Sequence, residues 1–85
     1  MTKYEDLAEN KIDYEEIKKV VEYSFKRNIK SKGDIGREFI ITLEEYEILV
    51  EDFDFVKNYC SEFGYRIEAF YSKTFNPRYY IKFTI

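Results

Sequence analysis

Four carboxylates recur at helical spacing inside the most acidic part of the chain. Residues 43–56, LEEYEILVEDFDFV, hold six acidic residues and no basic one. Four of the acidic residues follow the spacing i, i+3, i+7 and i+10 of one narrow helical stripe: Glu44, Glu47, Glu51 and Asp54. Such carboxylates can satisfy the Lys and Arg groups that otherwise bind phosphates. This acidic stripe therefore favours docking on a basic groove of a partner protein.

Three apolar side chains, Ile48, Phe55 and Tyr59, project beside the acidic stripe and away from the expected core. Aromatic anchors within a charged surround are typical of protein interfaces. Two interpretations stay open: these side chains face a partner, or the N-terminal arm covers them with Tyr4 and Leu7. On the first interpretation the candidate partner-binding residues are Glu44, Glu47, Ile48, Glu51, Asp54, Phe55 and Tyr59. On the second, the acidic stripe is a solvated helix face.

A second candidate surface lies near the C-terminus, where basic and aromatic residues alternate along two expected strands. Aromatic rings on a sheet can stack bases while basic groups hold phosphates. The candidate nucleic-acid-binding residues are Arg66, Phe70, Arg78, Tyr80 and Lys82. Glu68 interrupts this patch, no RNA-recognition motif is present, and cross-strand pairing or edge protection by Lys82 also explains the charges. Direct nucleic-acid binding is therefore the alternative rather than the main expectation.

Residue types that carry catalysis are scarce. The chain has no His, which removes Ser–His and Cys–His nucleophiles and the commonest metal ligand. Cys60, the single cysteine, falls on the expected core face, so we expect a structural thiol. No phosphate-binding glycine motif and no EF-hand loop occurs, although Glu44, Glu47 and Glu51 could hold a divalent cation loosely. We expect a non-enzymatic protein with no cofactor and no metal site.

The spacing of apolar residues along the chain predicts the helices and strands that position these residues. Apolar residues at spacings of three and four predict a helix from Asp13 to about Ile29. A β-branched run predicts a strand at 37–42, and a second helical pattern runs from 43 to 63. Alternation over 65–72 and 78–85 predicts a hairpin.

Capping signals support these boundaries. Asp13 with Glu16 resembles a capping box, and Thr42 with Glu45 forms one. Gly64 suits the position just after a helix end, where positive φ is needed. The expected core face of the second helix comprises Tyr46, Leu49, Val50, Phe53, Val56, Cys60 and Phe63.

The order α-β-α-β-β predicts an α+β fold with two layers, in which helices pack on one face of a small three-stranded sheet. The two C-terminal strands should be antiparallel, and the first strand could join either edge. At 85 residues we expect one domain, 1–85, with residues 1–11 as a loose arm.

Charge is unevenly distributed in this chain of net charge −3. Residues 44–63 carry seven acidic and one basic group, a net of −6, whereas residues 64–85 carry a net of +3 from four basic and one acidic group. The basic run Lys26, Arg27, Lys30 and Lys32 could pair with the acidic stripe of a second copy, which would make an oligomer-forming accessory protein or a homodimer. The N-terminus lacks the apolar core of a signal peptide and no run is long enough to span a membrane, so we expect the cytoplasm.

In its small size, its lack of catalytic residues and its acidic run from Glu44 to Asp54, the chain resembles the small, acidic, Tyr-rich inhibitors encoded by bacteriophages, anti-CRISPR proteins among them. The resemblance is one of composition over the whole chain, and no site residue carries over from it. It implies a viral inhibitor that acts in the host cytoplasm as a nucleic-acid mimic, with a host nucleic-acid-handling protein as its partner.

Overall fold

The computed structural model describes residues 12–74 and 76–85, and the N-terminal arm expected at 1–11 lies outside them. Its elements follow the chain as α2 (Tyr14–Asn28), the 3-10 turn η1 (Lys32–Asp34), β1 (Glu38–Ile41), α3 (Leu43–Val50), α4 (Phe53–Glu62), β2 (Arg66–Ser72) and β3 (Arg78–Thr84). The strand and hairpin predictions are confirmed to within two residues at each end.

The three strands form one antiparallel sheet in the order β1-β3-β2. β2 and β3 are the predicted hairpin, with Ala69 opposite Ile81. β1 joins the free edge of β3, where Phe39 lies opposite Ile81. The sequence left this placement open, and the structure makes β3 the central strand.

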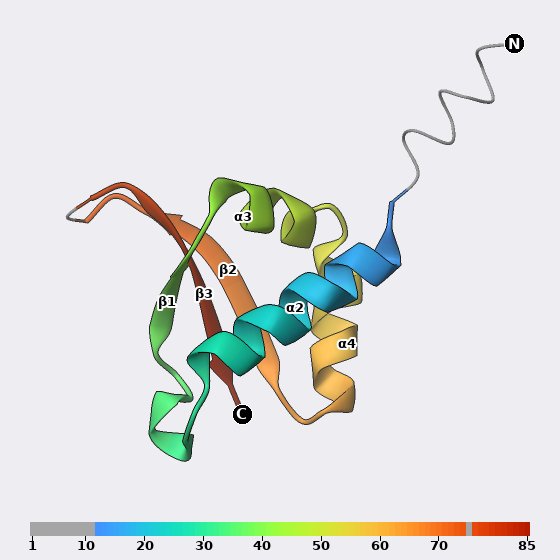
Figure 1. Ribbon diagram of the computed structural model, residues 1–85, viewed down its shortest axis with the longest axis horizontal. Coiled ribbons are helices and arrows are strands. Elements are labelled where there is room, and N and C mark those ends of the chain that lie inside the picture. The colour runs from blue at the N-terminus through green and yellow to red at the C-terminus, as the bar shows by residue number, and fades with distance from the viewer. Residues whose placement is uncertain (1–11, 75) are drawn as a thin grey trace, which may run out of the picture.

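The helices α2, α3 and α4 gather on one side of the sheet (Figure 1). The side chains of Ile41, Ile67, Ile81 and Phe83 point toward the helices and are buried, since alternate side chains of a strand point to the same face. Together with the inner helix faces they form the core: Ile17, Val21, Ile41, Leu49, Val56, Cys60, Ile67, Ile81 and Phe83. The predicted two-layer α+β fold is confirmed.

The prediction of one continuous helix over 43–63 was wrong, because Asp52 divides it. Asp52 has φ −148° and ψ 80°, which is not helical, and its side chain accepts a hydrogen bond from the backbone N–H of Phe55. It is the N-cap of α4, and Asp favours such caps because its carboxylate satisfies an otherwise unpaired N–H group. α3 and α4 therefore run in different directions (Figure 1).

The break also corrects the predicted core face. Leu49, Val56 and Cys60 are buried, and Tyr46 and Phe53 are partly buried against the core. Two residues of the predicted set face outward instead: the exposed fraction is 41% for Val50 and 64% for Phe63.

The caps predicted at the other helix ends are confirmed in the main. The Asp13 side chain accepts from the N–H of Glu16, and Thr42 and Glu45 form a reciprocal capping box. Gly64 follows α4 with φ 84°, a conformation that L side chains rarely adopt.

Candidate functional site

The acidic stripe is exposed but divided between two helices. Glu44 and Glu47 lie on α3, and Glu51 follows it with helical φ and ψ of −57° and −40°. Asp54 lies in the first turn of α4, where its carboxylate is 3.7 Å from the Lys57 ammonium. The structure therefore keeps three carboxylates together and places the fourth on a helix of different direction.

The three apolar residues beside the stripe are partly buried. α2 contacts two of them, Phe55 and Tyr59. The Tyr14 ring lies 4.6 Å from the Phe55 ring, centroid to centroid, and the Lys18 ammonium lies 5.7 Å from the Tyr59 ring centroid. Ile48 is partly buried against the core. These side chains therefore have partners within the described residues, whereas the N-terminal arm that was the other expected cover lies outside those residues.

A hydrogen bond joins α2 to α4 at this contact. The Tyr59 hydroxyl donates to the Glu22 carboxylate. This bond, reinforced by partial burial and by the negative charge of Glu22, raises the pKa of Tyr59 to about 12. The neutral phenol is thus the form that the folded protein stabilises.

Replacing Tyr59 by Phe is expected to remove a contribution to the free energy of unfolding that the wild type itself loses at alkaline pH. The folded protein holds the phenol proton more tightly, with a pKa of about 12, than the unfolded chain does at its ordinary value of 10.0. The stabilisation is therefore complete below pH 10.0 and is lost as the pH rises through about 12. Urea unfolding across that interval should show a steeper decline for the wild type than for Tyr59→Phe. Tyr23→Phe, at an exposed position of α2 next to Glu22, is the control. Equal slopes for the wild type and Tyr59→Phe would contradict the role of the bond.

The second candidate surface is assembled on the sheet face that points away from the helices. The register places Arg66 opposite Thr84, Glu68 opposite Lys82 and Phe70 opposite Tyr80. Directly opposed residues share a face, so the structure brings all five predicted residues onto one face: Arg66, Phe70, Arg78, Tyr80 and Lys82. The strand β1 adds Glu38 and Ile40 to it, opposite Lys82 and Tyr80.

On this face, two neighbouring rows of side chains run across the three strands, and they differ in polarity. One row is apolar: Ile40 is half exposed, and the Phe70 and Tyr80 rings stack with centroids 5.7 Å apart. The next row is charged, with the Lys82 ammonium 3.2 Å from the Glu68 carboxylate. Cross-strand pairing is therefore confirmed, whereas edge protection by Lys82 was wrong because β3 is the central strand.

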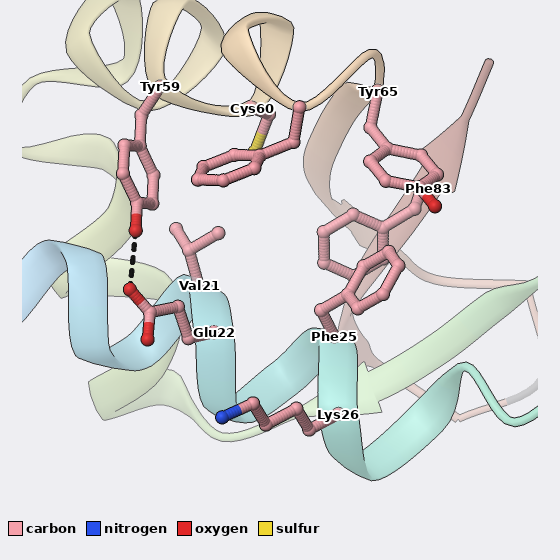
Figure 2. A pocket seen from close by; sticks show the side chains of 9 residues that line it. Val21, Glu22, Phe25, Lys26, Tyr59, Cys60, Tyr65 and Phe83 are labelled. Atoms are coloured by element: carbon pink, nitrogen blue, oxygen red, sulfur yellow. Dashed lines mark hydrogen bonds between the residues drawn. The ribbon is translucent and has the colours of Figure 1, made fainter.

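A groove between α2 and α4 is a third feature, and the sequence reasoning missed it. Its volume is about 380 Å³. Figure 2 shows Val21 and Lys26 of α2 on one wall and Cys60 of α4 on the other. Aromatic side chains dominate the lining, which comprises Val21, Glu22, Phe25, Lys26, Tyr59, Cys60, Phe63, Tyr65 and Phe83. No spacing within either helix predicts it, because it depends on the angle between them.

Cys60 has the environment of a structural thiol. It is buried, and burial raises its pKa to about 11, which keeps the thiol protonated at neutral pH.

Comparison of the chain with protein-family models, curated proteins and solved structures finds no match. Within residues 12–74 and 76–85, no group of three or more His, Cys, Asp and Glu side chains is placed to hold a metal ion. The helices of the same part of the chain are all too short or too polar to cross a membrane.

Proposed function

We propose that this protein is a non-enzymatic inhibitor or adaptor that docks the exposed acidic face of α3 on a basic surface of a nucleic-acid-handling protein. One observation carries the proposal. Glu44, Glu47 and Glu51 all lie exposed on or directly after α3. Among the described residues their carboxylates form no side-chain hydrogen bond or ion pair, so they remain free to accept bonds from a partner.

The charge density of this face is close to that of a nucleic-acid strand. Helical residues rise 1.5 Å each, so Glu44 to Glu51 span about 10.5 Å of axis. One strand of B-DNA carries a phosphate about every 3.4 Å, or roughly three to four phosphates over that length. Three carboxylates over the same length can engage Lys and Arg side chains that are spaced for phosphates. This supports mimicry of the kind that phage-encoded anti-CRISPR inhibitors use.

The arrangement has a local cost that folding does not explain. Glu47 has like charges at i−3 and i+4, and each such pair destabilises a helix by about 0.2–0.5 kcal/mol. Glu44 offsets part of this cost because it lies in the first turn, near the positive end of the helix dipole. The Glu47–Glu51 pair lies toward the C-terminal end of α3 and has no such compensation, which favours a role in binding for these side chains.

Neutralising the acidic stripe is expected to abolish docking. The test variant carries Glu44→Gln, Glu47→Gln, Glu51→Gln and Asp54→Asn. The matched control carries four Gln replacements at exposed acids elsewhere: Glu15, Glu38, Glu62 and Glu68. Both changes remove four negative charges from a net charge of −3 and give +1, so any difference between them reports position rather than total charge.

Each protein would be immobilised and exposed to the DNA-column fraction of a bacterial lysate. We expect the wild type and the control to capture a protein that high salt or free duplex DNA releases, since screened charge contacts carry the binding. The stripe variant should capture at least about tenfold less. Equal capture by the stripe variant and the control would contradict the proposal.

The sheet face supports a second candidate, binding of single-stranded nucleic acid. The observation that favours it is the presence of Arg66, Arg78 and the Phe70–Tyr80 pair on one face that no described helix covers. Against it, Glu38 and Glu68 flank Lys82, so the positive charge is partly neutralised. A gel shift of a single-stranded oligonucleotide at low salt, abolished by Arg66→Gln with Arg78→Gln, is the expected result of this candidate. The absence of any shift with the wild type would exclude it.

A further inference from the structure

Strand β2 leaves one edge of the sheet open. The strand order β1-β3-β2 places it at an edge, where it pairs with β3 alone. Its register with β3 is continuous over Arg66–Ser72, so no bulge interrupts it, and it contains no proline. Within residues 12–74 and 76–85, no backbone–backbone hydrogen bond outside the sheet involves residues 66–72. Every second N–H and C=O group of β2 therefore points to a free edge.

The opposite edge of the sheet is better protected. β1 has only four residues, Glu38–Ile41. The Arg27 guanidinium of α2 donates to the Ile40 carbonyl oxygen over 3.5 Å. Short edge strands, and edges that another element covers, both hinder pairing with another chain. β2 has seven residues and no such contact in the described part of the chain, so it is the edge that can accept a further strand.

On the outer sheet face, the apolar row runs across the three strands and ends at this edge. Ile40 of β1 lies opposite Tyr80 of β3, and Tyr80 lies opposite Phe70 of β2. The Phe70 and Tyr80 rings stack, with centroids 5.7 Å apart and 24° between their planes. No described strand continues the row beyond Phe70.

A row of rings ends at the same edge on the face toward the helices. The Tyr46 ring of α3 lies 4.5 Å from the Tyr79 ring, centroid to centroid, and the Tyr79 ring lies 4.9 Å from the Tyr71 ring. Tyr71 of β2 is the last of the three and is 43% exposed. Two residues before it in β2 lies Ala69, on the same face. Both rows therefore stop beside the free backbone of β2.

We propose that β2 pairs in the antiparallel direction with β2 of a second copy, about a two-fold axis at Phe70, to form a six-stranded sheet. The axis sets each Phe70 opposite the other, so the outer row Ile40–Tyr80–Phe70 continues into the same row of the second copy. On the inner face each Tyr71 lies opposite Ala69 of the other chain, a small side chain that leaves room for the ring.

Charge and size select this register among its neighbours. An axis at Glu68 would set two carboxylates directly opposite each other, which destabilises a sheet. An axis at Ala69 would face two small side chains and set Glu68 opposite Phe70. With the axis at Phe70, residues 68–72 of both chains pair, Glu68 lies opposite Ser72 and no like charges meet. An axis nearer either end of β2 pairs at most three residues of each strand.

This dimer is closed and does not depend on the proposed docking. Its two outer edges are the protected β1 edges, so a third copy has no free edge to join. No residue of the acidic stripe takes part, and neither does the basic run 26–32 through which the sequence suggested a homodimer. Five paired residues a chain fall short of the roughly 20–30 of a standard interface, so the dimer should form reversibly at about 100 µM.

Sedimentation equilibrium of the full chain tests the dimer. We expect the wild type to change from monomer to dimer as its concentration rises from about 10 µM to about 1 mM. Phe70→Lys sets two ammonium groups opposite each other at the axis and should weaken the dimer at least about tenfold. The matched control Ile40→Lys makes the same change of charge on the same face, at a 51% exposed position of β1, and should dimerise as the wild type does. Circular dichroism establishes that both variants are folded.

A cysteine at the axis tests the register and does not rely on a loss of binding. Directly opposed residues of antiparallel strands have Cα atoms about 4.5–5.5 Å apart, within the range of about 4.4–6.8 Å that a disulfide spans. Oxidised glutathione should therefore convert Phe70→Cys to a covalent dimer and leave Ile40→Cys monomeric. The native Cys60 is buried, so the wild type should form no covalent dimer.

The other possible occupants of this edge give different results. An edge dimer should persist at about 1 M salt, where charges are screened beyond about 3 Å. A dimer that dissociates there would join the acidic stripe to the basic run and would overturn the proposal. Slow hydrogen exchange of all β2 amides in the dilute monomer would also overturn it, because another segment of the chain would then occupy the edge.

Three further outcomes contradict the edge dimer. The first is a wild type that stays monomeric at the highest concentration. The second is an Ile40→Lys variant that dimerises as poorly as Phe70→Lys. The third is a yield of covalent dimer from Phe70→Cys that does not exceed the yield from Ile40→Cys. Because none of these measurements involves the acidic stripe, their failure leaves the docking proposal to its own test.

Discussion

Leu49→Ala is expected to destabilise the fold by about 2–5 kcal/mol, the usual range for removing a large apolar side chain from a core. Leu49 has an exposed fraction of 0% and is the one buried residue within α3. A helix of eight residues is marginal by itself, so this side chain does most to hold α3 on the sheet. For 85 residues the total stability is roughly 4–13 kcal/mol, which makes the expected loss a large share. Thermal unfolding should show a midpoint at least about 8 °C lower.

Val50→Ala is the matched control for that prediction. Val50 is the next residue of the same helix, and helical period alone assigned it to the core. It is 41% exposed, so its truncation should change stability by no more than about 0.5 kcal/mol. If Val50→Ala were as damaging as Leu49→Ala, the orientation of α3 described above would be wrong.

Local signals predicted most of the fold. Helix starts at Asp13 and Thr42 could be predicted because a side-chain oxygen caps nearby N–H groups wherever the rest of the helix lies. The hairpin could be predicted because alternation of apolar residues specifies which face is buried. The position of β1 could not be predicted, since both edges of the hairpin offer unpaired backbone groups and the choice between them depends on packing across the whole sheet.

The helix break was missed because the period of the apolar residues continues through it. Leu49, Val56 and Cys60 keep helical spacing across residues 51 and 52, so periodicity favours one helix. The competing signal was Asp52 itself, which ranks low in helix interiors and high at N-caps. With α4 redirected, Phe55 and Tyr59 meet α2 instead of solvent.

Among the candidate surfaces, too, local sequence patterns could predict some, whereas the packing of distant segments determines the other. Exposure of Glu44 and Glu47 could be predicted, because charged residues on one helix stripe rarely become buried. The shared sheet face of Arg66 and Tyr80 followed from strand alternation. The groove could not be predicted, because contacts between residues 37 positions apart, such as Tyr59 with Glu22, set the angle between its walls.

Asp52→Ala is expected to lower stability by about 0.5–2 kcal/mol through the loss of the N-cap of α4. The side chain has a second contact, because the Tyr14 hydroxyl donates to its Oδ2 atom over 3.0 Å. One carboxylate therefore holds the starts of α2 and α4 together, and the measured loss should fall at the upper end of that range. Chemical denaturation of the wild type and the variant measures it.

Three further variants identify the cause of that loss. Asp52→Asn should retain most of the stability, since the Asn oxygen also caps helices and the NH2 group that replaces Oδ2 can donate to the Tyr14 hydroxyl oxygen. Tyr14→Phe should destabilise the wild type but not the Asp52→Ala variant, because the hydroxyl has lost its acceptor there. Asp54→Ala, two residues along and fully within the helix, should have a small effect because its ion pair with Lys57 lies at the surface. If Asp52→Ala were instead neutral, α3 and α4 could join into one helix at little cost, and Phe55 and Tyr59 would again be free to face a partner.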